Sequence, residues 1–155
     1  MESDTVKKYW RGYLDSLPPN TPTDNLHYVA EYFGDSPELA NELGALIVAG
    51  TKTATCSALW EWEADDDPLP EVGLKTIVLN GDMQPLCIIE TTEVTMRPYN
   101  QVNAQFAFEE GEGDRSLEYW REAHWHFFSR SLPKIGKEPT QEMPLVCERF
   151  KVIYR

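Results

Sequence analysis

Hydrophobic residues recur at helical spacing near the start of the chain and again before position 50. The first stretch, residues 4–17, is followed by Pro18-Pro19, which prevents a helix from continuing. The second begins at Ser36-Pro37-Glu38, where a capping residue, a first-turn proline and an early acid favour a helix start, and it ends at Gly50. The pattern predicts two helices, and residues 27–33 between them are expected to form a short apolar helix or a turn.

A third helix is predicted from Ser116 onward, and strands are predicted on both sides of it. Residues 75–79 and 86–96 have strand character and are joined through Asn80-Gly81, the dipeptide that most strongly favours a β-hairpin. Residues 145–154 form another predicted strand. One apolar stripe runs along the third helix: Leu117, Trp120, His124, Phe127 and Phe128. Because helices come first, strands come later and no repeat is present, the pattern indicates an α+β fold.

Length and composition fit one compact domain of 155 residues, with a helical extension at about residues 1–35. Hydrophobic residues make up 41% of the chain, which excludes a disordered protein. No apolar run approaches the roughly 18 residues that a membrane span needs. The start, Met1-Glu2-Ser3-Asp4, lacks the basic and then apolar order of a signal peptide, so a cytoplasmic protein without a membrane partner is expected.

The chain is strongly acidic, with 26 acidic and 14 basic residues and a net charge of −12. Such a chain repels a polyanion on average, so broad electrostatic binding to nucleic acid is excluded. Basic residues concentrate after Arg97 and include Arg115 and Arg121, which leaves open a local basic face as well as a scattered surface. Residues 61–71 hold six acids and two prolines and are expected to form a solvated loop.

Lys52 is the most informative single residue for chemistry. It lies in Gly50-Thr51-Lys52-Thr53-Ala54-Thr55-Cys56-Ser57, among four hydroxyl side chains, and it is the only Lys or Arg between Arg11 and Lys75. If Lys52 lines a pocket, its ammonium can hold an anion or a carbonyl oxygen, and burial is expected to lower its pKa toward acid/base work. The alternative is a surface lysine after a helix end.

The three cysteines predict neither a disulfide nor a structural metal site, because they are widely separated and no CxxC pair or zinc-type histidine spacing is present. Cys87 and Cys147 lie in apolar strand-like runs and are expected to be small core residues. Cys56 lies close to Lys52, which leaves a thiolate nucleophile as an alternative. The sequence therefore predicts no metal and no cofactor.

Further candidates lie around the third predicted helix. The run from Glu109 to Asp114 precedes it as a capped acidic loop, and its glycines would let a carboxylate approach a ligand. His124 lies on the apolar stripe and is expected to be a hydrogen-bonded core histidine, with proton transfer as the alternative. Trp60 can stack a base or fill the core, and Ser129 can hold a phosphate or simply end the helix. A carboxylate near Lys52 would complete a cluster of cation, hydroxyl and acid.

These residues, taken in order, resemble the ASCH domain family from about Leu39 to the C-terminus. The resemblance implies a small β-barrel similar to the PUA RNA-binding fold, flanked by helices, with the lysine region facing a cleft. It also implies a link to RNA and nucleosides, because some members are amidohydrolases of N-acylated cytidine, others are ribonucleases and others are attached to transcription coactivators. The blocks that carry it are Gly50-Thr51-Lys52-Thr53-Ala54-Thr55, Ser57-Ala58-Leu59-Trp60, Val72-Gly73, Cys87-Ile88-Ile89-Glu90-Thr91-Thr92, Phe106-Ala107, Glu110-Gly111-Glu112-Gly113-Asp114, Trp120-Arg121, His124 and Val146-Cys147-Glu148-Arg149-Phe150.

The resemblance also implies a catalytic trio of lysine, threonine and glutamate, which falls on Lys52, Thr55 and Glu110, with Glu112 as the competing match. The leading hypothesis is a hydrolase of a nucleoside or of RNA, working without metal, in which Thr55 is the nucleophile or positions water. Lys52 would activate it and stabilise an oxyanion, and Glu110 would carry the proton. Residues expected to contact substrate are Thr53, Ser57, Trp60, Glu112, Arg121 and Ser129.

Two other functions remain open at this point. The same cleft would suit a binding module for a nucleotide or single-stranded RNA, with Lys52 as a fixed contact to a phosphate or carbonyl. An acidic surface would also suit a protein-interaction domain with a basic partner. The physiological substrate, any protein partner and the oligomeric state are not determined by the sequence.

Overall fold

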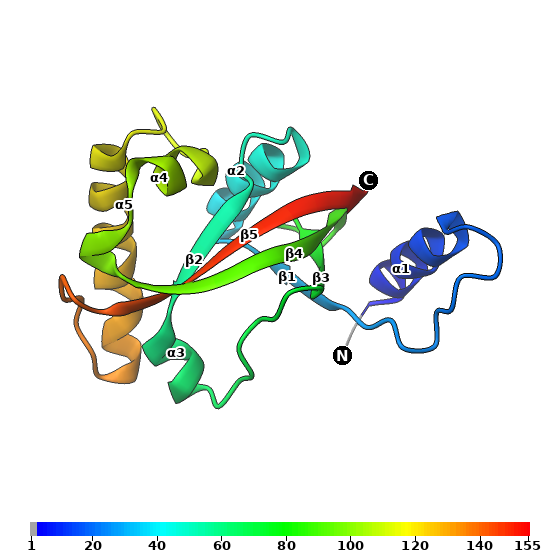
Figure 1. The fold of residues 1–155 in the computed structure, drawn as a ribbon, viewed down its shortest axis with the longest axis horizontal. Helices are drawn as coiled ribbons and strands as arrows, with labels where there is room; N and C mark the ends of the chain where they lie inside the picture. Colours follow the sequence, from blue (N-terminus) through cyan, green and yellow to red (C-terminus); the bar gives the residue numbers. More distant parts are fainter. Residues whose placement is uncertain (1–2) are drawn as a thin grey trace. The chain divides into compact units, whose positions relative to one another are not determined.

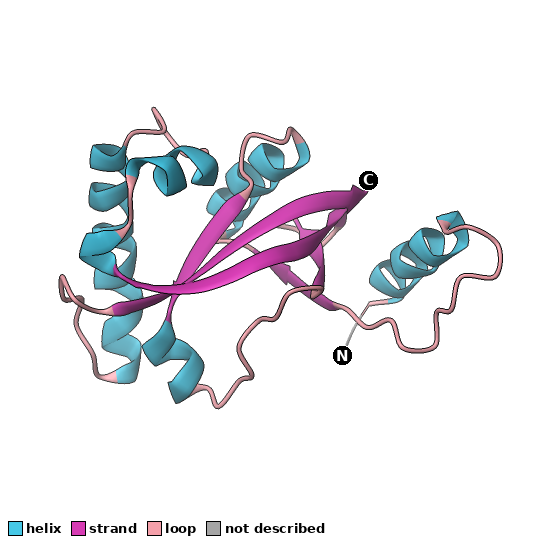
Figure 2. Cartoon of the chain, in the orientation of Figure 1, coloured by secondary structure: helices cyan, strands magenta, loops and turns pink. Residues whose placement is uncertain are grey.

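The computed structural model describes residues 3–155, and its helices and strands are drawn in Figures 1 and 2. Two short 3-10 turns, η1 (Tyr99–Gln101) and η2 (Leu132–Ile135), follow β4 and α5. The regular elements are, in chain order, α1 (Asp4–Ser16), β1 (Val29–Tyr32), α2 (Pro37–Val48), β2 (Ala54–Ala58), α3 (Leu59–Ala64), β3 (Lys75–Leu79), β4 (Pro85–Pro98), α4 (Ala104–Glu110), α5 (Leu117–Ser131) and β5 (Pro144–Tyr154).

The strands form one mixed sheet with the order β1-β3-β4-β5-β2. β1 pairs in parallel with β3, whereas β3 pairs antiparallel with β4, and β2 pairs antiparallel with β5. The predicted α+β fold class is confirmed. The hairpin expected at Asn80-Gly81 is also present, since β3 ends one residue before this dipeptide and β4 returns antiparallel.

The chain divides into two compact units, and each has its own hydrophobic core. The first unit consists of the described residues up to Gly50, together with Gly73–Glu90 and Lys151–Arg155. Its core joins the buried face of α1 to β3 and β4. Ser3 caps α1 by accepting a hydrogen bond from the backbone N–H of Val6. The buried side chains of this core are Val6, Trp10, Tyr13, Ile77, Leu79 and Ile88.

The second unit consists of Thr51–Val72 and Thr91–Phe150. Its core is built from β2, α4, α5 and β5. Successive strand residues point to opposite faces, so Ala54, Cys56 and Ala58 of β2 turn toward this core. The core includes Phe106, Ala107, Trp120, Phe128, Leu132, Met143, Leu145 and Cys147. The expectation that Cys147 is a small core residue is confirmed, and Cys87 of the first unit is buried as well.

Three local predictions were wrong. Residues 29–32 form strand β1 instead of a helix or turn, because β3 provides a parallel partner. Residues 59–64 form helix α3, so the acidic stretch predicted as a solvated loop begins inside a helix. Glu109 and Glu110 are not in a loop but at the end of α4, which Asn103 caps at its start and which Gly111 ends with a φ of 74°.

None of the helices in the described part of the chain has both the length and the apolar character needed to cross a lipid bilayer.

Candidate functional site

Lys52 lies immediately before β2, in a backbone segment fixed on both sides. The N–H of Thr53 donates to the carbonyl oxygen of Glu109 at 2.8 Å, and the N–H of Phe150 donates to the carbonyl oxygen of Thr53 at 3.0 Å. This segment is therefore held between the end of α4 and strand β5. The side chain of Lys52 is directed inward and is only 1% exposed, so the alternative of a surface lysine after a helix is excluded.

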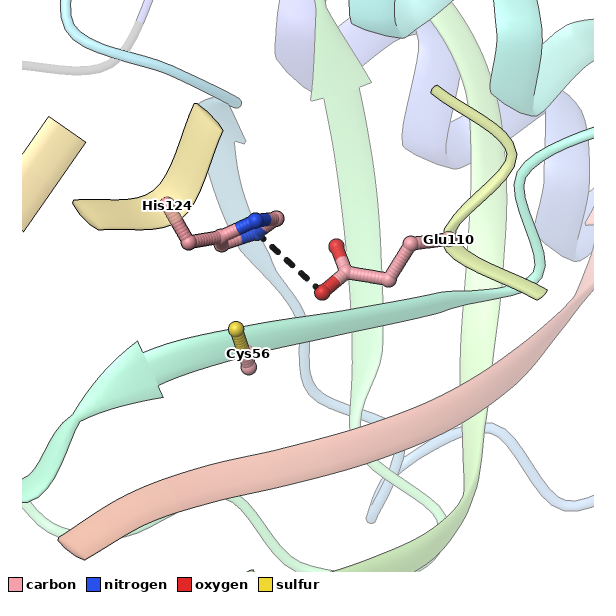
Figure 3. A group of neighbouring side chains, drawn as sticks. All are labelled: Cys56, Glu110 and His124. Carbon is pink, nitrogen blue, oxygen red and sulfur yellow. Dashed lines mark ion pairs between the residues drawn. The ribbon is translucent and has the colours of Figure 1, made fainter. Parts of the chain in front are cut away.

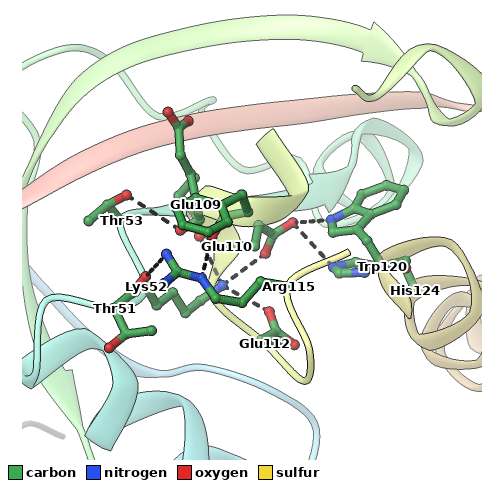
Figure 4. A network of polar contacts seen from close by, with 11 residues as sticks. Thr51, Lys52, Thr53, Glu109, Glu110, Glu112, Arg115, Trp120 and His124 are labelled. Carbon is green, nitrogen blue, oxygen red and sulfur yellow. Dashed lines mark hydrogen bonds and ion pairs between the residues drawn. The ribbon is translucent and has the colours of Figure 1, made fainter. Parts of the chain in front are cut away.

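The Lys52 ammonium donates three hydrogen bonds, which uses all of its donors (Figure 4). Its Nζ lies 2.9 Å from the carbonyl oxygen of Ala54, 2.8 Å from Oε1 of Glu110 and 3.1 Å from Oε2 of Glu112. The two glutamates that competed for the same role in the sequence therefore both bind Lys52. They differ in exposure, because the Glu110 side chain is 2% exposed and the Glu112 side chain is 21% exposed.

Glu110 connects Lys52 to α5 through its second oxygen. Oε2 accepts a hydrogen bond from the indole Nε1 of Trp120 at 2.7 Å and lies 3.3 Å from Nε2 of His124. Trp120 and His124 are one helical turn apart, and their rings stack with centroids separated by 4.2 Å. One buried carboxylate thus has partners on β2, through the Lys52 segment, and on α5.

The contacts of His124 favour its charged form. Nδ1 lies 2.8 Å from the carbonyl oxygen of Trp120, and Nε2 faces the Glu110 carboxylate. Both partners are acceptors, so a proton on each ring nitrogen satisfies both contacts. The network then contains two cations, Lys52 and His124, and two anions, Glu110 and Glu112. Its charges balance within a site that water barely reaches.

The pKa shifts agree with this charge assignment. Burial alone lowers the pKa of Lys52, but the charges of Glu110 and Glu112 outweigh it and raise the pKa above its ordinary value of 10.5. Burial raises the pKa of Glu110, but Lys52 and His124 outweigh it and hold that pKa below 4.5. For His124, the effect of burial is again outweighed by Glu110, and its pKa is raised above 6.5. The predicted lowering of the Lys52 pKa is wrong, because the prediction did not include the two carboxylates.

Cys56 lies beside the network on β2, as Figure 3 shows. Burial and the neighbouring Glu110 raise the pKa of its thiol well above 9.0, which disfavours the alternative of a thiolate nucleophile. Its sulfur, a Glu110 oxygen and a His124 nitrogen lie within 4.8 Å of one another, and these are zinc-type ligands. However, both Glu110 oxygens already accept from Lys52, Trp120 and His124. These side chains therefore suit the ion-pair network better than they suit a bound metal ion.

The other predicted site residues on β2 and α3 have different neighbours. Cys56 faces Glu110, so strand alternation directs the side chains of Thr55 and Ser57 to the opposite face of β2. Ser57 Oγ accepts from the indole Nε1 of Trp62 at 2.8 Å. Trp60 is partly buried against the hydrophobic core, with the Lys137 ammonium 5.5 Å from its ring centroid. Their roles in substrate binding stay predictions.

The remaining candidates lie at the margin of the network or outside it. Thr53 is exposed, and its Oγ1 lies 3.4 Å from the carbonyl oxygen of Glu109. Arg121 is exposed on α5 and lines an open hollow with Tyr99, Leu117 and Gln141. Ser129 is exposed and donates to the carbonyl oxygen of Trp125 at 2.7 Å, as a helical serine often does. None of the contacts described for Arg121 or Ser129 involves Lys52.

His124 and Trp120 are the residues whose importance the sequence understated. Their spacing of four on a helix places them on one face, and both have a ring nitrogen that must find a partner when buried. That combination is a signal for a shared polar partner inside the core. It does not indicate which carboxylate provides the partner, because Glu110 belongs to a helix that the sequence pattern did not reveal.

The mixed sheet and the helices around it define an α+β domain of the PUA-like type. The chain belongs to the ASCH domain family, because the model of this family, described as the ASCH domain, matches residues 29–154. The comparison with curated proteins gives no match.

Solved structures agree with this assignment. An ASCH domain from Lactobacillus crispatus is 38% identical, with a TM-score of 0.93, and the match covers 99% of this chain and 96% of that one. A protein from Enterococcus faecalis is 39% identical, with a TM-score of 0.83 and coverage of 97% and 88%. An ASCH protein from Zymomonas mobilis is 11% identical, with a TM-score of 0.51 and coverage of 80% and 65%, so it supports the fold alone. The predicted family is confirmed.

Proposed function

We propose that this protein is a hydrolase that acts on an N-acylated cytidine or a related modified nucleoside, or on RNA. The observation that carries the proposal is the buried network of Lys52, Glu110 and His124, in which two permanent ions and an imidazolium meet away from water. Buried ions are costly to keep, and an electrostatic role in catalysis is a reason to keep them. The ASCH family membership supports a substrate related to RNA or nucleosides.

The charge states assign a role to each group. Lys52 stays protonated because its pKa is raised, so it does not act as a base but stabilises the oxyanion that forms when water or a hydroxyl attacks an acyl carbon. His124 carries a proton that it can give to a leaving amine, such as the exocyclic amine of cytosine. Glu110 holds both cations in position. Because the Thr55 side chain points to the face of β2 opposite Glu110, water is the proposed nucleophile, and the proton that it loses replaces the one that His124 gives to the amine. Trp60 is the proposed stacking surface for the base.

A binding module is the second candidate, and the saturated Lys52 ammonium favours it. Every donor of Lys52 already has an acceptor, which is the arrangement of a fixed contact that holds one site geometry. In that case the protein would capture a nucleoside or an RNA end without converting it. Both candidates use the same residues and differ only in whether product forms.

Incubation of the purified protein with N-acetylcytidine, and separately with single-stranded RNA, distinguishes the two. We expect cytidine to be released from N-acetylcytidine by the wild-type protein, and Lys52→Met to reduce the rate at least about 100-fold, as loss of an oxyanion contact does. Thr55→Val should keep the wild-type rate in the same assay, because its side chain points away from the network. Binding without product in the wild-type protein supports the module, and undiminished turnover in Lys52→Met refutes the proposed mechanism.

A further inference from the structure

We infer that Glu112 is a displaceable internal ligand of Lys52, whose carboxylate occupies the position that a substrate oxygen takes during binding. The inference deepens the proposed function, and its substrate part rests on that function. The structure shows Lys52 closed off from any substrate. Lys52 has no free donor and is 1% exposed, so a substrate oxygen can reach its ammonium only if one of the three present acceptors leaves.

Of the three acceptors, Glu112 is the one that can leave. The carbonyl of Ala54 belongs to the backbone of β2 and cannot move without disrupting the strand. Glu110 is buried and is also held by Trp120 and His124. Glu112 makes the longest of the three contacts, 3.1 Å, and its side chain is 21% exposed. A rotation about its side-chain bonds moves the carboxylate into water, and such rotations are fast.

The loop that carries Glu112 is built to hold the carboxylate at this point while leaving the side chain free to rotate. A Cβ on Gly111 would approach the carbonyl oxygen of Thr51 to 2.5 Å, so only glycine allows the backbone to lie this close to the Lys52 segment. Arg115 secures the other end of the loop, with Nε 3.0 Å from the carbonyl oxygen of Phe108 and a second nitrogen 3.3 Å from that of Thr51. Figure 4 shows Arg115 beside Thr51 and Glu112 on the same side of the network as Lys52.

Charge specifies the chemistry of the incoming group. With Glu112 in place, Lys52 and His124 balance Glu110 and Glu112. When Glu112 rotates away, the buried part of the network carries one excess positive charge. A neutral carbonyl oxygen restores the hydrogen bond but not the charge, whereas an oxyanion or a carboxylate restores both. The open site is therefore complementary to the oxyanion of a tetrahedral intermediate more than to the ground-state acyl group.

Acetate tests the displacement without any nucleoside, because it reproduces the Glu112 carboxylate. Glu112→Ala removes the internal ligand, and Glu138→Ala is the matched control, since Glu138 is exposed and the charge change is the same. Thermal unfolding is followed in sodium acetate and in sodium chloride of equal ionic strength. We expect acetate to raise the melting temperature of Glu112→Ala selectively, with no such gain for the wild-type protein or for Glu138→Ala. An equal response in all three proteins, or none in Glu112→Ala, overturns the inference.

Affinity for N-acetylcytidine, compared with cytidine, tests the substrate part when binding is followed by stopped-flow tryptophan fluorescence before hydrolysis proceeds. Glu112→Gln weakens the internal competitor, so the open state is more populated and the apparent dissociation constant for N-acetylcytidine should fall about 10-fold. Cytidine, which lacks the acyl oxygen, should bind with unchanged affinity, and Glu138→Gln should change neither value. A fall that is equal for both ligands, or weaker binding, contradicts the inference. If N-acetylcytidine does not bind at all while acetate stabilises Glu112→Ala, the proposed substrate is wrong and the displacement stands.

Discussion

The cores of the two units are built by different means. In the first unit, α1 packs its aromatic and aliphatic face on β3 and β4, and the buried side chains include Trp10, Tyr13 and Ile88. The second unit also has an apolar core, but in addition it buries Lys52 and Glu110, each 1% exposed. Among the residues that the structure describes, these two are the charged residues classed as buried.

The two cores are therefore expected to contribute differently to the stability of the protein. Burial of apolar surface stabilises the first core directly, in proportion to the area removed from water. A buried ion pair gives little net stability, because the cost of removing two charges from water offsets their attraction, and an apolar pair of similar volume is often as stable. The first core therefore needs no explanation beyond folding. For the second core, the proposed chemical role would account for ions that contribute little to stability.

The largest expected effect comes from breaking the second core at one ion. Lys52→Ala leaves the Glu110 carboxylate buried without its cation, which should lower the free energy of unfolding by about 3 to 5 kcal/mol. Urea unfolding followed by far-UV circular dichroism measures this change. A loss below about 1 kcal/mol, the range of an exposed ion pair, would show that the pair is accessible to water.

A truncation in the first core has a similar cost but a different consequence. Ile88→Ala should lower the free energy of unfolding by about 2 to 5 kcal/mol, because it removes buried methyl groups and leaves a cavity. At a temperature where the variant remains folded, its affinity for N-acetylcytidine should equal that of the wild-type protein. A large loss of affinity would mean that the first core also determines the site.

Trp120 has an intermediate expected effect. Trp120→Phe keeps an aromatic ring in the core but removes the indole N–H that donates to Glu110 at 2.7 Å. A hydrogen bond to a charged group contributes about 1.5 to 3 kcal/mol, and the free energy of unfolding should fall by that amount. Lys52 and His124 still hold the carboxylate, so the loss of unfolding free energy should be smaller than in Lys52→Ala. Urea unfolding of both variants under one set of conditions measures the two losses.

The smallest expected effect is a pH dependence that comes from His124. Its pKa is raised above 6.5 in the folded protein, so the folded state holds the proton more tightly than the unfolded chain. The resulting stability is complete below pH 6.5 and is lost as the pH rises through the raised pKa. Unfolding free energies measured from about pH 5 to about pH 10 should show this decline in the wild-type protein and a weaker one in His124→Gln. Equal slopes in the two proteins would mean that His124 is not the titrating group.

Much of the fold could be predicted, because local sequence determines where many of its elements begin and end. Ser36 and Ser116 accept the capping hydrogen bonds of α2 and α5 that their positions predicted. Strand β1 could not be predicted in the same way, since its four residues are partly exposed and become a strand only by pairing with β3. Helix α4 is short, and its acidic end resembled a loop.

The site was predicted less completely than the fold. Lys52 stood out because it is isolated among acidic and hydroxyl residues, and Glu110 followed from the family resemblance. The charge states did not follow, because the pKa of Lys52 depends on two carboxylates that are 58 and 60 residues away in the chain. His124 was expected to be a core residue with a hydrogen bond, and its carboxylate partner could be identified only in three dimensions.

Turnover by a folded protein without the central ion pair tests the account most directly. In Lys52→Met combined with Glu110→Gln, no buried charge is left unpaired at these two positions, so the double variant should be more stable than Lys52→Met alone. The measurement is the rate at which this double variant releases cytidine from N-acetylcytidine. The account predicts a rate at least about 100-fold below that of the wild-type protein. Release at the wild-type rate, or no release by the wild-type protein itself, would contradict it.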